Sequence, residues 1–369
     1  MIEIFKDFTK IENQVYRIRD ELKNFYKEVI LNEIGGCFVL SLKNDNTDKH
    51  LILQSGLHGI EGYAGFAMIN HFIEKYVIES YDSKDFIKNY DISLIINTNP
   101  YGVKNKRRVN ENNVDLNRNF MPDEKDFKNQ NDQYYLIDEV INPKKRIVNF
   151  HISYVEAIFG VLKLVLKIGA SKFKTILLAG QRYNSNGVYY MGEEYQIQTR
   201  NLIKIYEQLF EIKGFENTIF IDLHTGYGPA FNMSIVNSYF MKENDFTQKL
   251  KNLYGNIVQS NTDSFYTMNG DLIDFIYKKY PFIKYATAFE FGTFGDNLIA
   301  GMKSVIAIIL ENQYFYNNLN GSKNNFNFND KTGQKVLRFY EIAYLPEKKK
   351  WWEKAVIDFD KAIKGILSL

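Results

Sequence analysis

Three buried strands that end in glycine turns constrain the fold of this chain more than any other feature. The segments "LILQSGLHGIEG" (51–62), "FIDLHTGYG" (220–228) and "YATAFEFGTFG" (285–295) each run from apolar residues into glycines. Each also carries a histidine or a glutamate where its apolar run ends. In open α/β sheets, functional side chains gather at the carboxyl ends of the parallel strands. The pattern therefore predicts an α/β fold with a site at that edge of the sheet.

Strand and helix patterns alternate along the rest of the chain. Apolar runs at 37–43, 50–56 and 91–100 predict strands, and the first two read as a hairpin across a polar turn. Helical spacing of apolar residues predicts a helix over 62–79. Further helices are predicted over 1–30, 155–169, 199–212, 301–319 and the tail 334–369, with another strand at 174–180. This alternation favours a sheet with helices on its faces.

The composition argues against several classes of partner. Of 369 residues, 46 are basic and 44 acidic, and the formal net charge of +2 favours neither nucleic acid nor a membrane. The single cysteine, Cys37, cannot form an internal disulfide. The most apolar stretch is interrupted by Lys163 and Lys167, and the amino terminus lacks the apolar region of a signal peptide. We therefore expect a cytoplasmic protein.

Four side chains at the strand ends match the requirements of a catalytic zinc site. Such a zinc takes three protein ligands, mostly histidine nitrogen and carboxylate oxygen, and keeps a fourth position for water. His58, Glu61 and His224 supply this set, and Glu290 is left for general base work. The competing interpretation is that each histidine is an ordinary hydrogen-bonded core residue. His151, in "NFHISY", also competes with His224 for the ligand role.

The segment "NPYGVKNKRRVNENNVDLNRNF" (99–120) strengthens the case for a site. It contains an Asn-Pro turn, two adjacent arginines and then "DLNRNF". Core packing does not require Asp, Asn, Arg and Asn within six residues, whereas an electrostatic pocket does. With these motifs in order, the sequence resembles the M14-type zinc carboxypeptidase superfamily. Within it, the sequence is most similar to a cytoplasmic bacterial branch near the succinylglutamate desuccinylases and aspartoacylases.

The resemblance spans roughly residues 50–310 and implies a role for each matching residue. His58 and Glu61 match the H-x-x-E ligand pair of the family, and His224 in "DLHTG" matches its distal ligand. Glu290 in "FEFGT" matches the catalytic glutamate.

The same resemblance implies which residues bind the substrate. Asn117 and Arg118 in "DLNRNF" match the pair that grips the terminal carboxylate of the substrate. Arg108 matches the arginine that polarises the scissile carbonyl group, with the adjacent Arg107 as the alternative.

Two further matches concern a mobile tyrosine and a supporting acid. Tyr266 is followed at steps of four by Gly270 and Asp274 in "YTMNGDLID", the spacing around the catalytic tyrosine of classical carboxypeptidases. Asp115 is expected to hold the Nδ1 proton of His58, so that Nε2 faces the metal. The alternative for Asp115 is a turn-stabilising side chain.

For the fold, the resemblance implies a single α/β domain over residues 1–369. Its mixed, mostly parallel β-sheet of about eight strands would be flanked by helices. The long interval between Phe120 and His224 predicts an insertion within about 121–200, and the Asn-rich stretch 317–333 is a candidate linker. The alternative is two domains divided near residue 120.

For the function, the resemblance implies a hydrolase with one Zn²⁺ per chain that cleaves an amide bond next to a free carboxylate. A metallocarboxypeptidase fits best, because Tyr266 and its neighbours match that side of the superfamily. The alternatives are an N-acyl amino acid deacylase, of the desuccinylase or aspartoacylase kind, and a catalytically inactive metal-binding module. The expected partner is a small peptide or acyl-amino-acid substrate, and the oligomeric state stays open.

Overall fold

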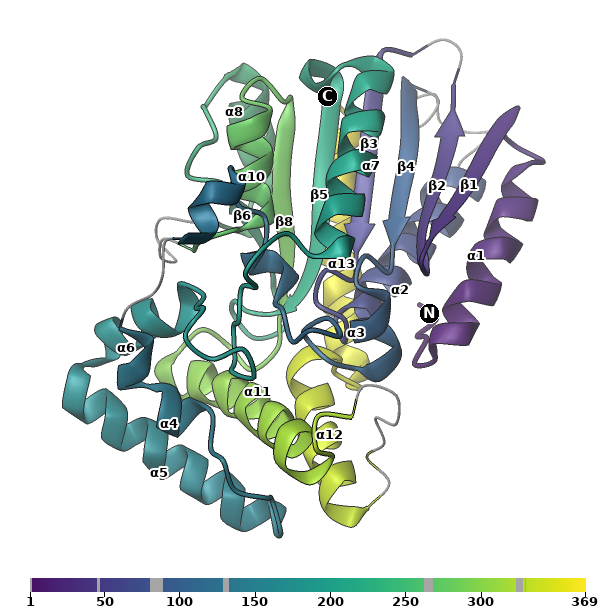
Figure 1. Cartoon of the computed structure of the whole chain (residues 1–369). Helices are drawn as coiled ribbons and strands as arrows, with labels where there is room; N and C mark the ends of the chain where they lie inside the picture. Colours follow the sequence, from purple (N-terminus) through teal and green to yellow (C-terminus); the bar gives the residue numbers. More distant parts are fainter. Residues whose placement is uncertain are drawn as a thin grey trace.

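An eight-stranded mixed β-sheet forms the centre of the molecule (Figure 1). The computed structural model describes residues 2–44, 47–79, 89–128, 133–261, 268–322, 328 and 330–369. The strands lie in the order β1-β2-β4-β3-β5-β8-β6-β7, and helices cover both faces of the sheet. Strands from both halves of the chain share this one sheet, so the predicted α/β fold class is confirmed.

The strands at the centre of the sheet are parallel. β3 (Lys49–Ser55) pairs in parallel with β4 (Tyr90–Ile96) on one side and with β5 (Thr218–Gly226) on the other. β5 also pairs in parallel with β8 (Tyr285–Gly292). The carboxyl ends of these strands therefore lie along one edge of the sheet. The outer strands are β1 (Glu28–Ile34), β2 (Cys37–Lys43), β6 (Met233–Asn237) and β7 (Val258–Asn261).

Both faces of the central strands are apolar, as expected where helices cover a parallel sheet on both sides. Leu51 and Leu53 of β3 belong to one hydrophobic cluster, and Ile52 between them belongs to another. Successive strand residues point to opposite faces, so one continuous apolar run supplies both clusters. The first cluster includes α1 (Phe8–Leu22), α2 (Gly62–Phe72) and α13 (Lys349–Leu367), and the second includes α7 (Ile197–Lys213) and α10 (Leu272–Lys279).

Most of the remaining helices gather beyond the carboxyl edge of the sheet, at the bottom of Figure 1. Aromatic packing joins two of them, since the rings of Phe150 and Phe339 lie 6.0 Å apart. The helices of this group are α4 (Asp138–Ile141), α5 (Phe150–Ile168), α6 (Ala170–Leu178), α11 (Leu298–Asn318) and α12 (Lys331–Tyr344). Elsewhere lie α3 (Pro100–Asn105) and α8 (Asp245–Tyr254), and a π-helix, Ile73–Ile78, continues α2.

The predicted hairpin between strands 37–43 and 50–56 is wrong. Both strands form, but β2 pairs antiparallel with β1 and β4, and β4 separates it from β3. Apolar periodicity identifies a strand without naming its partner. Here the chain leaves β3, passes through α2 and returns as β4, which occupies the place beside β3.

Two other predicted elements differ from the structure. Residues 174–180 do not form a strand, because most of this stretch is the last part of α6, whose residues Phe173, Ile176 and Leu177 are buried at helical spacing. The helix predicted over 1–30 ends at Leu22, and β1 begins at Glu28. Short apolar stretches satisfy both helix and strand patterns, so tertiary packing decides between them.

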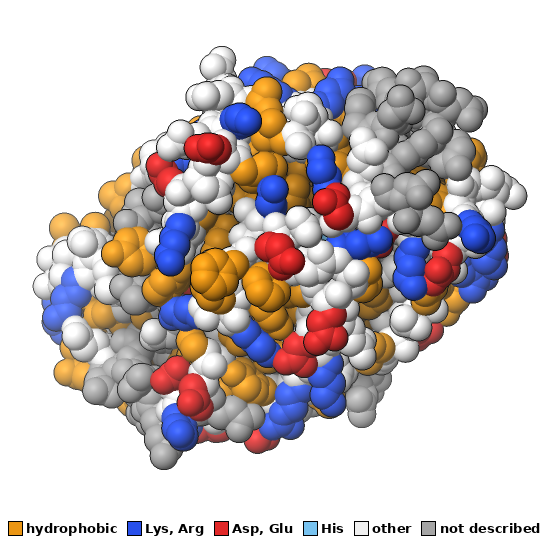
Figure 2. Space-filling model, turned by 90° about the horizontal axis from the view of Figure 1, so that it is seen from above, with side chains coloured by type: hydrophobic (Ala, Val, Ile, Leu, Met, Phe, Trp, Pro, Cys, Tyr) orange, Lys and Arg blue, Asp and Glu red, His pale blue; other side chains and the backbone are white. Residues whose placement is uncertain are grey.

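The surface carries charges of both signs. Figure 2 views the end of the molecule where the central parallel strands begin, and basic and acidic side chains are interspersed over its coloured part. Within the described residues, no helix combines the length and the apolar content that a membrane span requires.

Candidate metal centre

The turn after β3 places His58 and Glu61 side by side. His58 Nδ1 lies 3.0 Å from Glu61 Oε1, and the two residues are only 4% and 2% exposed. Between them, Gly59 packs against α3 so closely that a Cβ atom there would lie 1.9 Å from the carbonyl carbon of Gly102. Glycine in the sequence His-Gly-Ile-Glu is therefore needed for the close approach that positions this turn.

His224 completes a cluster of three side chains. It lies near the end of β5, and its Nδ1 is 3.2 Å from Glu61 Oε2. One candidate ligand atom from each of His58, Glu61 and His224 lies within 4.8 Å of the other two, and all three residues are buried. Two imidazoles and a carboxylate converging in this way fit a divalent metal ion. The structure thus brings together the three ligands predicted from the sequence.

Each histidine of the cluster has a carboxylate at its outer nitrogen. His58 Nε2 lies 3.2 Å from Asp115 Oδ1, and His224 Nε2 lies 2.7 Å from Asp222 Oδ2. Carboxylates in this position fix the orientation of metal-binding histidines. The expectation that Asp115 holds His58 through Nδ1 is wrong, because Nδ1 faces Glu61. The sequence analysis missed Asp222. The signal was its position two residues before His224 on the same strand, because residues two apart on a strand point to the same face of the sheet.

Acidic and basic side chains lie in direct contact within the buried cluster. Burial opposes the charged form of Glu61, but the neighbouring His58 and His224 outweigh it and hold the pKa of Glu61 below its usual range. Burial also disfavours a charged His224, yet the adjacent Asp222 raises the pKa of His224 well above its ordinary value. Glu61 therefore stays ionised, which is the state that a carboxylate ligand requires.

Glu290 lies on the strand next to that of His224. The register of β5 and β8 sets the two residues directly opposite one another. Glu290 Oε1 accepts a hydrogen bond from the backbone N–H of Tyr227 at 2.9 Å. Burial raises the pKa of Glu290 to about 7, although His224 acts in the opposite direction. A carboxyl group with this pKa can both accept and release a proton near neutral pH.

The structure separates the two adjacent arginines. Arg108 Nε donates to Asp115 Oδ2 at 2.8 Å, and Arg108 Nη2 lies 2.7 Å from His58 Nε2. Arg107 points away from the cluster, and its Nε donates to Glu311 of α11 at 2.7 Å. Arg108 is thus the arginine at the site, whereas Arg107 is buried against α11.

Asn117 and Arg118 line the same cavity as the three clustered side chains. Arg118 Nε donates to the carbonyl oxygen of Leu178 at 3.0 Å, and its Nη1 donates to that of Asn117 at 2.8 Å. These partners are neutral, so they orient the guanidinium group without cancelling its charge. Asn117 Nδ2 in turn donates to Asp271 Oδ2 at 3.0 Å. Asn117 therefore ties the Arg118 turn to the start of α10.

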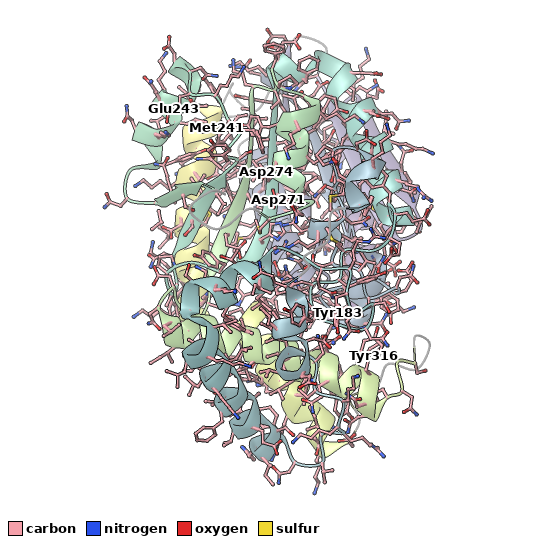
Figure 3. The ribbon with its side chains drawn as sticks, turned by 60° about the vertical axis from the view of Figure 1, so that its left-hand side comes forward. Tyr183, Met241, Glu243, Asp271, Asp274 and Tyr316 are labelled. Atoms are coloured by element: carbon pink, nitrogen blue, oxygen red, sulfur yellow. The ribbon has the colours of Figure 1, made fainter. Side chains whose placement is uncertain are left out.

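The predicted Tyr266 lies outside the described residues, so its role stays a prediction. The residues that follow it are tied to the site. A Cβ atom on Gly270 would lie 2.3 Å from the carbonyl oxygen of Arg118, so only glycine allows this approach. Asp271 and Asp274 lie together at the amino end of α10 (Figure 3), where Asp271 Oδ1 accepts the backbone N–H of Asp274 at 3.0 Å.

The cavity has a volume of about 540 Å³. Tyr189, which the sequence analysis missed, forms part of its wall. The ring centroid of Tyr189 lies 5.2 Å from the guanidinium carbons of both Arg108 and Arg118. Its backbone φ of 57° lies in the left-handed region, which is costly for an aromatic residue. The only signal in the sequence is the Asn186-Gly187 turn just before it.

Other cavity walls are apolar, and they come both from helices within the predicted insertion and from a helix that follows it. Val165 of α5 and Phe173 of α6 belong to the insertion, whereas Met302 and Val305 belong to α11. The rival ligand His151 lies elsewhere, exposed at the amino end of α5 with its Nε2 3.3 Å from Lys335 Nζ. His151 belongs to no metal-type cluster among the residues that the structure describes.

Comparison with known proteins places the chain in a family. Residues 39–358 match the family described as "Protein of unknown function (DUF2817)". The chain belongs to this family. No curated protein sequence matches this DUF2817 chain.

Solved structures share the fold of this DUF2817 protein. Bovine thrombin-activatable fibrinolysis inhibitor, solved with a tick carboxypeptidase inhibitor, matches with a TM-score of 0.53 and 14% identity over 100% of this chain and 99% of that chain. Carboxypeptidase A from Helicoverpa armigera matches with a TM-score of 0.52 and 15% identity over 94% and 75% of the two chains.

A third structure, succinylglutamate desuccinylase from Chromobacterium violaceum, has a TM-score of only 0.38 and 13% identity over 83% of this chain and 73% of that chain. The first two structures therefore show the shared fold. The carboxypeptidase-like α/β fold that the resemblance implied is confirmed.

Proposed function

We propose that this protein is a zinc-dependent hydrolase that cleaves an amide bond next to a free carboxylate, as a metallocarboxypeptidase. The observation that carries the proposal is the convergence of His58, Glu61 and His224 within 4.8 Å, with Glu290 opposite His224 on the neighbouring strand. Metal ligands beside a proton-accepting carboxylate at one end of a cavity form the machinery of a metallohydrolase.

The two histidines and Glu61 would hold the zinc, one ion per chain. When bound, zinc acts as a Lewis acid that acidifies a water molecule and polarises a carbonyl group. Histidine nitrogen and carboxylate oxygen are ligands that zinc accepts in catalytic sites. Asp115 and Asp222 orient the imidazole rings from behind, at 3.2 and 2.7 Å.

Glu290 would accept a proton from the attacking water and deliver it to the leaving amide nitrogen. A pKa of about 7 suits both steps, since the group changes charge near the operating pH. Arg108 would face the carbonyl oxygen as negative charge develops on it. Asp115 raises the pKa of Arg108 well above its usual value, so the guanidinium stays charged. Donors of this kind contribute about 2.7 to 4 kcal/mol in other hydrolases.

Arg118 would bind the carboxylate of the substrate. Its planar group presents parallel N–H donors that match a carboxylate geometrically, and its partners in the structure are neutral carbonyl groups. Asn117 adds a polar amide beside it at the cavity wall. The apolar walls from α5, α6 and α11 would then accept the side chain next to that carboxylate, and Tyr189 would flank both arginines.

The test is metal analysis combined with hydrolysis of a matched substrate panel. Each peptide is supplied with a free carboxyl terminus and as the terminal amide, together with a set of N-acyl amino acids. We expect turnover of free-acid peptides that chelation abolishes and Zn²⁺ restores, with the amides resistant. Turnover confined to N-acyl amino acids would assign a deacylase instead. Bound metal without hydrolysis of any amide would leave only a binding module.

A further inference from the structure

Helix α5 has two apolar faces, and only one of them is covered. Its inner face is buried through Ser153, Ala157, Val161 and Leu164. Its outer face, together with the residue before the helix cap, exposes a row of large hydrophobic side chains with exposed fractions from 37% to 86%. This outer stripe consists of Val148, Ile152, Val155, Phe159, Leu162 and Leu166.

The spacing of the outer stripe is that of a coiled-coil seam. Within the helix, its members follow one another at alternating steps of three and four residues from Ile152 to Leu166, which is the a/d pattern of a heptad repeat, and Val148 precedes the helix cap. Such a stripe lies along one side of the helix and presents a continuous ridge. In Figure 1, α5 lies at the lower edge of the molecule with α11 on its inner side, so the ridge faces outward.

An outward apolar ridge is not what packing within one chain requires. A helix on the surface of a protein normally turns a polar face to water. Helix α13 has the same length of 19 residues and follows this rule, because Ile357 is its one exposed large hydrophobic residue. A contiguous apolar patch of this kind marks an interaction surface. The outer stripe therefore calls for a partner that presents a matching ridge.

The charges beside the stripe identify that partner as a second copy in antiparallel orientation. Glu156 and Lys163 lie three residues before and four residues after Phe159, on the flank that follows the stripe. A two-fold axis near Phe159 brings Glu156 of each copy across from Lys163 of the other. Parallel packing would not create these pairs. Glu156 now contacts Lys145 at 2.6 Å, but this exposed ion pair is weak enough to exchange.

We propose that the outer stripe of α5 is a homodimer interface in which the α5 helices of two chains pack antiparallel. The contact is isologous, so each copy contributes the same apolar ridge and the same two charges. Phe159 lies nearest the axis and meets the stripe of the other copy at its centre. The proposal is independent of the hydrolase activity, because it concerns a surface outside the metal cluster.

The first experiment measures self-association by sedimentation equilibrium over a range of protein concentrations. We expect a reversible dimer for the wild type. Phe159→Glu places two acids at the axis and should raise the dimer dissociation constant by about 10²-fold or more, as for a central interface residue. Phe282→Glu is the matched control, since Phe282 is 70% exposed but lies between α10 and β8, and it should leave the dimer intact. Leu166→Glu, at an 86% exposed position, repeats the test independently of Phe159.

The second experiment tests the orientation by exchanging charges. Glu156→Lys and Lys163→Glu each convert two attractive pairs into repulsive ones, so each should weaken the dimer by about tenfold at low salt. The double variant restores opposite charges across the axis and should regain most of the wild-type affinity. A membrane surface or an unrelated partner would not show this recovery.

Two results would overturn the proposal. A wild-type chain that stays monomeric at its solubility limit would exclude the dimer. Binding of a monomer to anionic phospholipid vesicles, lost in Phe159→Glu, would assign the stripe to a membrane surface instead. Circular dichroism of every variant confirms that the fold is intact, and exposed positions should tolerate these changes.

Discussion

His224 and Glu290 face one another across the adjacent parallel strands β5 and β8. His224 lies in the metal-type cluster. Glu290 accepts a hydrogen bond from the backbone N–H of Tyr227 and lines the same cavity. Because their spacing is set by the sheet register, the proposed ligand and the proposed proton acceptor are held at a fixed separation without help from a loop.

Replacing Glu290 by Gln should remove the proton acceptor while leaving the cavity intact. We expect turnover of a confirmed substrate to fall by about 10² to 10⁴-fold with unchanged metal content. Asp296→Asn, at another acid that lines the cavity, is the control and should keep most of the activity. Steady-state kinetics measures the turnover of both variants, and metal analysis measures their bound metal. Near-wild-type turnover in Glu290→Gln would refute the mechanism.

His224→Ala should lose the metal, since two remaining ligands hold zinc poorly. His151→Ala should retain one bound metal ion per chain, because His151 is exposed and lies outside the cluster. Mass spectrometric metal analysis of both purified variants gives the answer. The opposite pattern would make His151 the ligand and overturn the site described above.

Arg118→Gln should reduce kcat/KM for free-acid peptides by about 10²-fold or more, the scale for losing one partner of a buried charge pair. For the terminal amides, which lack the carboxylate, the substitution should change kcat/KM little. Arg118→Lys should recover only part of the loss, because an ammonium group lacks the planar pair of donors. An equal effect on acids and amides would show that Arg118 has only a structural role.

Gly59→Ala should destabilise the protein by about 3 kcal/mol or unfold the turn that carries His58 and Glu61, because the new methyl group overlaps the backbone of Gly102. Gly301→Ala is the matched control. Gly301 lies in α11, and apart from its chain neighbours and the backbone of its own helix no atom lies within 4 Å of the position that a methyl group would take there, so alanine should stabilise the protein by about 1 kcal/mol. Urea unfolding of both variants measures the difference.

His50 should make the stability fall at acid pH. It is fully buried on β3 with its Nε2 2.9 Å from Ser93 Oγ, and burial lowers the pKa of His50 to about 4. Between this value and the ordinary 6.5, the unfolded chain binds the proton and the folded chain does not. Stability therefore rises with pH across that window, by about 3 kcal/mol in total from this group.

His50→Gln should flatten this part of the curve, whatever its effect on stability at pH 7. Urea unfolding of both proteins at steps between pH 4 and 7 provides the measurement. If the two curves run parallel, His50 is not the group responsible.

The sequence by itself specified the strands that carry the site and most of its side chains. β3, β5 and β8 are apolar on both faces, and this run is visible without a structure. Because His58, His224 and Glu290 follow or end such strands, their convergence at one sheet edge was predictable. The glycines around His58 also mark a close backbone approach, which the contact of Gly59 with Gly102 explains.

Tertiary structure alone decided the partners of each element. The place of β4 between β2 and β3, the helical state of residues 174–178 and the nitrogen of His58 that faces Glu61 all depend on contacts between distant segments. So do the opposite directions taken by Arg107 and Arg108, and the position of Tyr189 over two arginines. Periodicity records which face of an element is apolar. It does not record which element packs against that face, because the choice of partner depends on the free energy of the whole folded chain and not on any local stretch.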